Sequence, residues 1–239
     1  MEDGRKTVVI MGACGGIGSE LALVFKDTNL VLIDRNEEKL RKCAPNIGGV
    51  QLYGLDLTSE NEIETVATKI VNTNPVVDVL INAAGVGVYK TIEDVEYPEW
   101  TTSMSINVDG PYFLTKNLLP SLKNSKSAYV VNLGSGMSKI PTGGRSAYCT
   151  SKFALRGMTL SLAEEFDGTN VRFLHMVLGS VLTDFGPMSR AQKKERSLSG
   201  KSYLTPKSVA EKIYNLVEEE TKEKEIEFAP SGYDEPINR

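Results

Sequence analysis

Short runs of apolar and β-branched residues alternate along this chain with longer segments in which apolar positions recur at helical spacing. The short runs predict strands at 6–10, 30–34, 50–55, 76–82, 127–133, 171–177 and 226–229. In the first, second, fourth and fifth runs the apolar residues are nearly continuous rather than alternating. That pattern is typical of strands buried on both faces of a parallel sheet.

The segments between the strands predict helices at 19–26, 37–43, 60–71, 100–119, 148–166 and 205–220. Regular alternation of strand and helix favours an α/β fold with three layers, a doubly wound parallel sheet with helices on both faces and right-handed crossovers. The stretch 184–204 is polar, weakly periodic and too long for an ordinary connection. It is therefore predicted to be a lid or a mobile loop beside the substrate.

Composition narrows the classes of function. The chain has 239 residues, 41% hydrophobic and 24% charged, with a net charge of −4. These values fit a single domain over 1–239 and argue against a nucleic-acid partner. The basic run at 192–196 contains Glu195 and is interpreted as a solvated face. Neither a signal peptide nor a membrane-spanning run is found. Cys14, Cys43 and Cys149 lack metal-ligand spacing, and a reduced, cytoplasmic protein is expected.

A glycine-rich turn, MGACGGIG, follows the first predicted strand directly. Gly12, Gly16 and Gly18 would let the backbone approach a pyrophosphate, and the next helix would direct its free N–H groups at it. Glycines can also serve only to pack a helix tightly on a sheet. The acid about 20 residues further on favours a dinucleotide site.

That acid stands beside a base. Asp34 and Arg35 follow the second predicted strand, where an acid favours NAD and a base favours NADP. Asp34 occupies the nearer position, where it can accept hydrogen bonds from the ribose hydroxyls and would repel a 2′-phosphate. NAD is therefore the expected cofactor, and NADP the less favoured one.

Tyr148 and Lys152 share one face of a predicted helix. An ammonium near a phenol lowers the pKa of the phenol, so this pair is a candidate general acid and base. Ser135 ends the fifth predicted strand and Asn107 lies within a predicted helix, where an amide is not favoured. The small residues of 81–85 end the fourth strand, at the edge of the sheet where ligands bind.

Taken together, these motifs resemble the short-chain dehydrogenase/reductase family over nearly the whole chain. The resemblance rests on GACGGIG, the DLT at 56–58, NAAG at 82–85, Asn107, Ser135, YxxxK at 148–152 and GSVLT at 179–183. It implies a single-domain Rossmann fold with a seven-stranded parallel sheet. It also implies reversible hydride transfer between a nicotinamide and a carbonyl/alcohol pair.

The resemblance implies a role for each matching residue. Tyr148 would exchange the proton, Ser135 would hold the substrate oxygen, Lys152 would bind the nicotinamide ribose, and Asn107 would hold a water that connects Lys152 to solvent. The cofactor would contact Gly12, Cys14, Gly15, Gly16, Ile17, Gly18, Asp34, Arg35, Asp56, Leu57, Asn82, Ala83, Ala84, Gly85, Tyr148, Lys152, Gly179, Val181 and Thr183.

The chain departs from the family pattern at two positions. Met11 stands where a threonine usually precedes the first glycine, so a locally altered turn with binding retained is expected. Leu178 stands where a proline usually follows the sixth strand. Because proline would fix the chain direction there, this change affects the placement of Val181 and Thr183.

Other candidates have simpler interpretations. His175, the only histidine, lies in an apolar run and is interpreted as a core residue. Cys14 is interpreted as structural, although a helix N-terminus can acidify a thiol. Arg145 precedes Tyr148 by three positions and could pair with a substrate carboxylate or phosphate, or form a surface salt bridge. A largely apolar substrate pocket is expected from Val86, Val88, Met137, Phe185 and Met188.

The sequence therefore predicts an NAD(P)(H)-dependent oxidoreductase that interconverts a ketone and a secondary alcohol, and leaves the identity of the substrate open. A 3-oxoacyl thioester reductase using NADPH, a non-catalytic dinucleotide sensor and a nucleotide-sugar epimerase are the alternatives. Only about fifty residues follow Thr183, too few for an epimerase. The apolar positions of 148–166, together with 100–119, predict a homodimer or homotetramer.

Overall fold

Seven parallel strands form one sheet in the computed structural model, which describes residues 4–43 and 49–230. The sheet order is β3-β2-β1-β4-β5-β6-β7, and every neighbouring pair is parallel. This confirms the expected seven-stranded sheet. The single-domain prediction extends beyond the described residues at both ends. The strands are β1 Thr7–Met11, β2 Asn29–Asp34, β3 Gln51–Gly54, β4 Val79–Asn82, β5 Ala128–Leu133, β6 Val171–Leu178 and β7 Glu225–Phe228.

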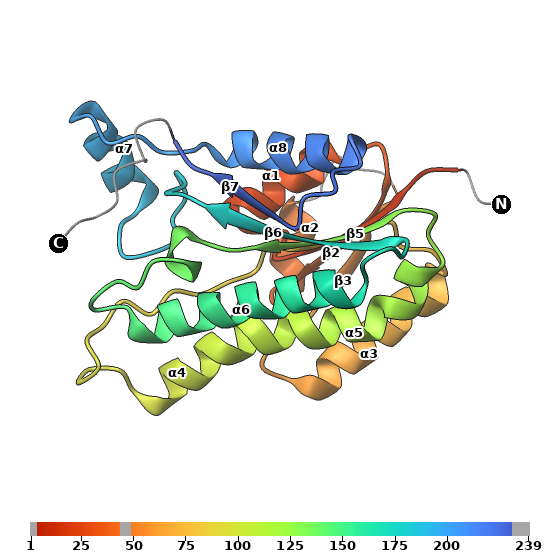
Figure 1. Ribbon diagram of the computed structural model, residues 1–239, viewed down its shortest axis with the longest axis horizontal. Helices are drawn as coiled ribbons and strands as arrows, with labels where there is room; N and C mark the ends of the chain where they lie inside the picture. Colours follow the sequence, from red (N-terminus) through yellow and green to blue (C-terminus); the bar gives the residue numbers. More distant parts are fainter. Residues whose placement is uncertain (1–3, 44–48, 231–239) are drawn as a thin grey trace.

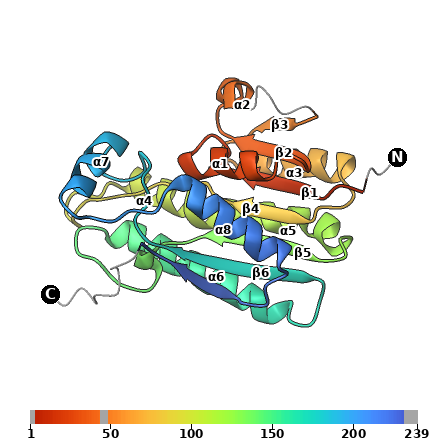
Figure 2. The same ribbon diagram turned by 90° about the horizontal axis from the view of Figure 1, so that it is seen from above.

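Helices cover both faces of the sheet and complete the three predicted layers. Figure 1 shows α1 and α8 on one face and α3, α4, α5 and α6 on the other, with α7 at one end. Figure 2 shows the sheet from above, with β3 near one edge and β7 near the other. The helices are α1 Gly16–Val24, α2 Glu37–Cys43, α3 Glu60–Thr73, α4 Tyr97–Met104, α5 Gly110–Lys123, α6 Ser146–Glu165, α7 Arg190–Leu198 and α8 Pro206–Glu218.

Each face of the sheet has its own apolar core, because successive side chains of a strand point to opposite faces. In β1, Val8 and Ile10 belong to the core that includes α1 and α8. Val9 and Met11 belong to the core that includes α3 and α5. All four side chains are buried. Burial on both faces explains why the strand is an unbroken apolar run.

The strand order places a ligand crevice at the centre of the sheet. From β1 the chain passes to β2 on one side, whereas β4 pairs with β1 on the other side. The connections that leave the carboxyl ends of β1 and β4 therefore diverge. In open α/β sheets ligands bind at such a point, so the fold brings the glycine turn and the NAAG segment to the same crevice.

The segment predicted as one helix at 100–119 is interrupted by a π-helical turn at Ser105–Asp109. The cause lies in Pro111. Proline has no N–H to donate to the carbonyl of Asn107, four residues earlier, and its ring would clash with it. The N–H of Gly110 instead bonds to the carbonyl of Ser105, five residues earlier. Such turns occur often at functional sites, and this one contains Asn107.

The prediction of an irregular stretch at 184–204 is wrong in part, because α7 occupies Arg190–Leu198. A reciprocal capping box starts this helix: the Ser189 side chain accepts the Gln192 N–H, and the Gln192 side chain accepts the Ser189 N–H. Beyond α7, Leu204 pairs with Val181 in an isolated parallel bridge. Within the described ranges, none of the helices is long and apolar enough to cross a membrane.

Candidate active site

The glycine turn is fastened to both neighbouring strands of β1. The N–H groups of Gly12 and Ala13 donate to the carbonyl of Ile33 in β2, at 2.8 and 3.1 Å. Gly12 has a φ of 84°, and a Cβ there would lie 2.5 Å from the backbone nitrogen of Ala84. Only glycine meets both requirements. Backbone contacts therefore hold this turn, although Met11 stands at the end of β1 in place of the threonine expected from the resemblance.

The next glycines bring the turn and the first helix together. A Cβ on Gly18 would lie 2.1 Å from the carbonyl oxygen of Gly12, and one on Gly16 would lie 2.6 Å from a methyl carbon of Thr183. Helix α1 starts at Gly16 with no side-chain cap and no acid in its first turn. Its first N–H groups and positive dipole end are therefore suited to bind an anion.

A cavity of about 580 Å³ opens beside this turn. Its size lies in the range of small-molecule and cofactor sites. Fourteen of the residues predicted to bind the cofactor line it: Gly12, Cys14, Gly15, Gly16, Ile17, Gly18, Asp34, Arg35, Asp56, Leu57, Ala83, Ala84, Gly85 and Thr183. The structure also adds residues that the sequence did not single out, among them Lys39, Ile106 and Arg190.

Asn82, predicted to lie along a ribose, does not line this cavity. Its amide donates to the Oδ1 of Asn132 at 2.7 Å, and the amide of Asn132 donates to the Oγ1 of Thr159 at 2.8 Å. This chain of hydrogen bonds is buried and ties β4 and β5 to α6. Among the described residues the Oδ1 of Asn82 has no hydrogen-bond partner. The structure thus places Asn82 in the layer behind the cavity.

Gly179 and Val181 also lie outside the lining of the cavity. The N–H of Gly179 donates to the carbonyl of Phe228 at 2.9 Å, and a Cβ there would lie 2.9 Å from Pro230. The chain then pairs with Leu204, whose N–H donates to the carbonyl of Ser180 at 2.9 Å. These contacts direct the segment after β6 back to the cavity, which Thr183 lines. They do so with Leu178 in place of the family proline.

Charged side chains gather at the end of the cavity beside β2. The Oδ2 of Asp34 accepts the N–H of Cys14 at 3.0 Å, which fixes the carboxylate against the glycine turn. Hydrogen bonds from Thr58, with a smaller contribution from Arg35, lower the pKa of Asp56. Lys39 lines the same end. Two carboxylates and two cations therefore surround the place where an adenosine would lie.

Cys14, also in this turn, is a buried thiol. Burial first, and then the neighbouring Cys43 and Asp34, raise its pKa to about 12. Because only the thiolate is a good nucleophile, this side chain is not activated. The structural interpretation of Cys14 is therefore supported over the acidic-thiol alternative.

Tyr148 and Lys152 lie in the first two turns of α6, and each side chain is only 4% exposed. The Nζ of Lys152 lies 5.9 Å from the centroid of the Tyr148 ring. It donates to the carbonyl of Leu133, at the end of β5, at 2.9 Å. Ser135 lies close enough to the Tyr148 hydroxyl to act on its pKa. The structure therefore brings together the three residues from which the sequence predicts proton transfer.

The acid–base properties of this pair differ from the expectation. Burial raises the pKa of Tyr148, and the opposing effects of Ser135 and Arg145 are smaller. Burial also lowers the pKa of Lys152 to about 8. Desolvation outweighs the attraction between ammonium and phenolate, because both side chains are almost fully enclosed. Tyr148 is therefore a neutral phenol here, a form suited to donating a proton.

Ser135 is positioned by a buried support behind it. Its Oγ accepts the N–H of Met137, and its carbonyl accepts the hydroxyl of Ser138 at 2.6 Å. The Nε2 of His175 lies 3.3 Å from that same hydroxyl. A Cβ on Gly134 would lie 2.3 Å from this nitrogen, so only glycine fits beside the ring.

His175 itself is fully buried, which confirms its interpretation as a core residue. Burial lowers its pKa to about 4, so the ring is neutral at physiological pH. The Ser138 hydroxyl uses its one proton in the bond to the Ser135 carbonyl, so toward His175 it can only accept. This favours the tautomer in which Nε2 carries the proton. His175 therefore supports the Ser135 turn without taking part in acid–base chemistry.

Asn107 occupies the π-helical turn, fully buried. Its Oδ1 accepts the N–H of Val86 at 2.9 Å, and its Nδ2 donates to the carbonyl of Val86 and the hydroxyl of Ser151, each at 2.9 Å. It thus holds the segment after β4 against α6, close to Gly85 and Lys152. The predicted water contact of Asn107 stays a prediction.

Two aromatic side chains enclose Tyr148. The ring centroid of Tyr89 lies 5.6 Å from the ring centroid of Tyr148, and the ring centroid of Phe185 lies 5.9 Å from it. Phe185 was expected in the pocket, whereas Tyr89 was missed. The sequence could have indicated Tyr89 by its position, four residues beyond the NAAG segment at the crevice end of β4. Tyr89 and Phe185 explain why Tyr148 is so little exposed.

Lys193 was also missed, since the sequence favoured a solvated face for the run 192–196. The structure buries it in α7, where its Nζ donates to the carbonyls of Thr183 at 2.7 Å and Phe185 at 2.6 Å, and to that of Val181 at 3.3 Å. It therefore holds the segment 181–185 that borders the cavity. Its adjacent residue, Lys194, is exposed.

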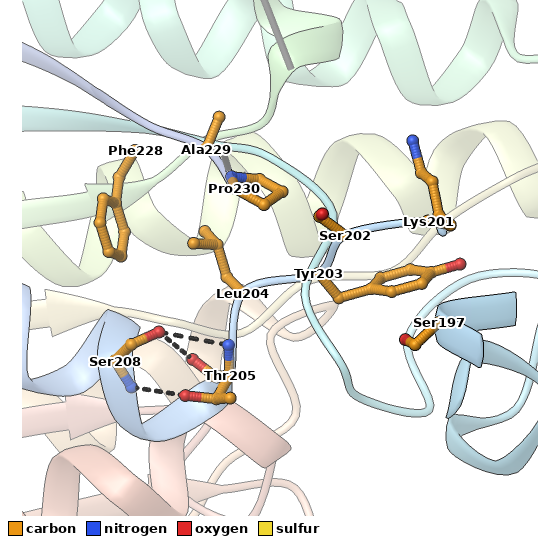
Figure 3. Close-up of a pocket in the computed structure, with 10 residues that line it drawn as sticks. All are labelled: Ser197, Lys201, Ser202, Tyr203, Leu204, Thr205, Ser208, Phe228, Ala229 and Pro230. Carbon is orange, nitrogen blue, oxygen red and sulfur yellow. Dashed lines mark hydrogen bonds between the residues drawn. The ribbon is translucent and has the colours of Figure 1, made fainter. Parts of the chain in front are cut away.

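A second hollow, of about 610 Å³, lies between the end of β7 and the chain that joins α7 to α8. Figure 3 shows its lining and the capping box in which Thr205 and Ser208 exchange hydrogen bonds at the start of α8. Lys201, Tyr203 and Pro230 are among its residues. It contains none of the predicted site residues, so the cavity at the glycine turn is the candidate active site.

Comparison with known proteins supports this fold and shows the family. The sequence model of the short chain dehydrogenase family matches residues 6–194. Dehydrogenase/reductase SDR family member 6 of Rattus norvegicus is 34% identical over 181 residues, which are 74% of this chain and 72% of that protein.

Two solved structures are similar throughout. The alcohol dehydrogenase of Thermococcus sibiricus, complexed with 5-hydroxy-NADP, is 26% identical with a TM-score of 0.83, covering 97% of this chain and 98% of that one. The 3-ketoacyl-(acyl-carrier-protein) reductase of Brucella melitensis, complexed with NADH, has a TM-score of 0.84 at 22% identity, covering 95% and 97%.

The doubly wound sheet has a glycine turn at its switch point, and α6 carries a tyrosine–lysine pair. These features define an oxidoreductase of the Rossmann type. The chain belongs to the short-chain dehydrogenase family.

Proposed function

We propose that this protein transfers hydride reversibly between NAD(H) and a ketone/secondary-alcohol pair. The observation that carries the proposal is the meeting of Ser135, Tyr148 and Lys152 at the carboxyl end of β5. Beside them lies a cavity lined by a glycine turn and the uncapped start of α1. The hydroxyl, phenol and ammonium supply the proton-transfer groups that a carbonyl reduction needs.

A dinucleotide fits the residues present. The first N–H groups of α1 would bind the pyrophosphate, Asp34 and Asp56 border the adenosine end, and Thr183 with Gly85 borders the nicotinamide end. The nicotinamide, when bound, supplies or accepts the hydride. Every other group that the reaction requires belongs to this chain.

Each side chain then has a physical role. Tyr148, a neutral phenol, donates the proton to the carbonyl oxygen during reduction. Ser135, which lies beside Tyr148, holds that oxygen. Lys152 lies behind the tyrosine ring, where a charged ammonium stabilises the phenolate that forms. Asn107 keeps Val86 and Ser151 in place around them.

The preferred nicotinamide cofactor in this proposal is NADH. The carboxylate of Asp34 is fixed by the N–H of Cys14 at the adenosine end, where it repels a 2′-phosphate by about 4 kcal/mol for charges 4 Å apart. Arg35 and Lys39 offer the opposing attraction. We expect NADH to be favoured by about tenfold in kcat/KM, about 1.4 kcal/mol. Faster turnover of NADPH at equal, sub-saturating concentration would contradict this choice, and Asp34→Ser is expected to relax it.

The function is tested by oxidation of NADH in the presence of a panel of ketones. The proposal expects turnover of at least one small ketone. Val86 and Phe185 line the cavity that would receive it. Turnover only of 3-oxoacyl thioesters with NADPH favours the reductase alternative. Tight binding of a dinucleotide with no turnover across the panel favours the non-catalytic sensor.

We also propose assembly into a homodimer or homotetramer in the cytoplasm. Three large apolar side chains are exposed on the helices of one face: Trp100 (38%), Tyr112 (43%) and Phe153 (41%). Figure 1 places their helices, α4, α5 and α6, side by side. A partner copy would cover them. A monomer mass by light scattering at micromolar concentration would refute the assembly. Free cysteines at 14, 43 and 149 support a reducing compartment, which cell fractionation tests.

A further inference from the structure

Arg145 lies close to the proposed catalytic residues. It occupies the residue before α6, three positions before Tyr148. Its guanidinium carbon lies 5.3 Å from the centroid of the Tyr89 ring, within the range of a cation–π contact. The Tyr89 ring in turn lies 5.6 Å from that of Tyr148. One aromatic ring therefore contacts both the guanidinium and the proposed proton donor.

A second contact ties Arg145 to the Ser135 side of the site. Its Nη1 lies 3.7 Å from the sulfur of Met137. The N–H of Met137 donates to the Oγ of Ser135 at 3.2 Å. The guanidinium is thus bordered by neighbours of both residues that would hold the reacting oxygen. This geometry places it beside the proposed catalytic residues rather than on a distant surface.

Arg145 has no carboxylate partner among the ion pairs of the described residues. Other arginines there do have partners: Arg156 lies 2.5 Å from Glu225, and Arg172 lies 3.8 Å from Glu220. Of the side chains whose charge acts on Tyr148, Arg145 is the cationic one. The surface salt bridge considered from the sequence is therefore not formed within the described part of the chain.

We propose that Arg145 binds the carboxylate of the substrate, which makes the substrate an oxo acid or hydroxy acid. This inference rests on the proposed function, because it names the substrate class of the same site. A guanidinium presents two parallel N–H donors that match the two oxygens of a carboxylate. Tyr89 holds the guanidinium on one face and leaves that edge for the anion. The reacting carbon lies a few bonds away, between Ser135 and Tyr148.

The experiment compares acids with neutral molecules of the same shape. Pyruvate, acetoacetate and levulinate place the ketone at increasing distance from the carboxylate, and each is paired with its methyl ester. Dihydroxyacetone phosphate and dihydroxyacetone form a further pair for a phosphate. Turnover with NADH gives kcat and KM, and titration calorimetry in the presence of NAD⁺ gives affinities that do not depend on turnover.

Three variants separate charge from shape. Arg145→Met is expected to weaken kcat/KM and affinity for the preferred acid by about 10–100-fold while leaving its ester unchanged, since it removes charge-assisted hydrogen bonds. Arg145→Lys keeps the charge without the fork and is expected to fall in between. Arg156→Met, on the same helix but outside the site, is the matched control and is expected to behave as wild type toward both.

Equal use of acids and esters, or equal loss of both in Arg145→Met, would overturn the proposal. A preference for dihydroxyacetone phosphate that disappears in Arg145→Met would overturn the carboxylate in favour of a phosphate. Failure of every acid to bind or react would also overturn it. If acids bind in an Arg145-dependent way without turnover, the anion site stands and the proposed reaction fails instead.

Discussion

The cofactor side of the site, at the glycine turn, and its substrate side, around Tyr148, are formed by different parts of the residues. On the cofactor side the structure is made by the backbone: Gly12 and Ala13 donate to β2, and Gly18 leaves no room for a Cβ. On the substrate side it is made by side chains, with Tyr89 and Phe185 against Tyr148. Backbone contacts tolerate few substitutions, whereas side chains can be exchanged at little cost to the fold. We therefore expect cofactor binding to depend on the backbone of the glycine turn, and proton transfer and the choice of substrate to depend on the side chains around Tyr148.

The comparison is sharpened most by removing one hydroxyl from the substrate side. Tyr148→Phe keeps the ring and its contacts to Tyr89 and Phe185 but removes the proton. Turnover of the substrate identified from the ketone panel is expected to fall by about 10²–10⁴-fold. Near-native turnover would remove Tyr148 from the proton transfer. Tyr97→Phe, an exposed tyrosine outside the site, is the control.

A second prediction concerns stability and the support behind Ser135. His175 is buried with a pKa of about 4, against about 6.5 in the unfolded chain. Above pH 6.5 the ring is neutral in both states, so it adds no pH dependence. Between pH 6.5 and pH 4 the unfolded chain binds a proton that the native protein does not. The free energy of unfolding should therefore fall by about 3 kcal/mol over that window.

The measurement is urea unfolding at half-unit steps from pH 7 to pH 4. The chain has one histidine, and glutamates titrate only near the lower end of this window, so between pH 6.5 and pH 5 the slope has one source among the side chains with an ordinary pKa there. His175→Gln is expected to flatten it. A free energy of unfolding that stays constant from pH 6.5 to pH 4 in the wild type would show that the ring is not held neutral.

The smallest of the three effects tests the segment that joins the two sides. Lys193→Met removes three hydrogen bonds to the carbonyls of 181–185. Thr183 and Phe185 should then be less ordered, and KM for NADH and for the ketone should rise by about tenfold. That change corresponds to about the free energy of one charge-assisted hydrogen bond. The adjacent, exposed Lys194→Met should leave both unchanged. Equal behaviour of the two variants would show that Lys193 does not order this segment.

The elements that the sequence predicted are those with a local physical signature. All seven strands were predicted, and in four of them burial on both faces leaves continuous apolar runs such as 30–34. The glycine turn was predicted because the close approach of Gly12 to Ala84 and the positive φ both require glycine. Helix α6 was predicted from the helical pattern of 148–166, which places Tyr148 and Lys152 on one face.

The features that the sequence analysis missed have weak local signals or depend on contacts between distant parts of the chain. Helix α7 is polar, so its periodicity was weak, and one buried lysine attaches it to 181–185. Its capping box, Ser189 with Gln192, was the available signal. The π-helical turn could have been predicted from Pro111, which has no N–H to donate to the carbonyl of Asn107, four residues earlier. The raised pKa of Tyr148 could not, since it follows from enclosure by Tyr89 and Phe185.

The separation of the two sides is the central claim, and NADH binding tests it most directly. Titration calorimetry with NADH is expected to give Tyr148→Phe the affinity of the wild type. Gly18→Val is expected to bind no NADH, because its Cβ would lie 2.1 Å from the Gly12 carbonyl oxygen and disrupt the turn. Circular dichroism of both variants checks that they are folded. Loss of NADH binding in Tyr148→Phe, or its retention in a folded Gly18→Val, would contradict the account.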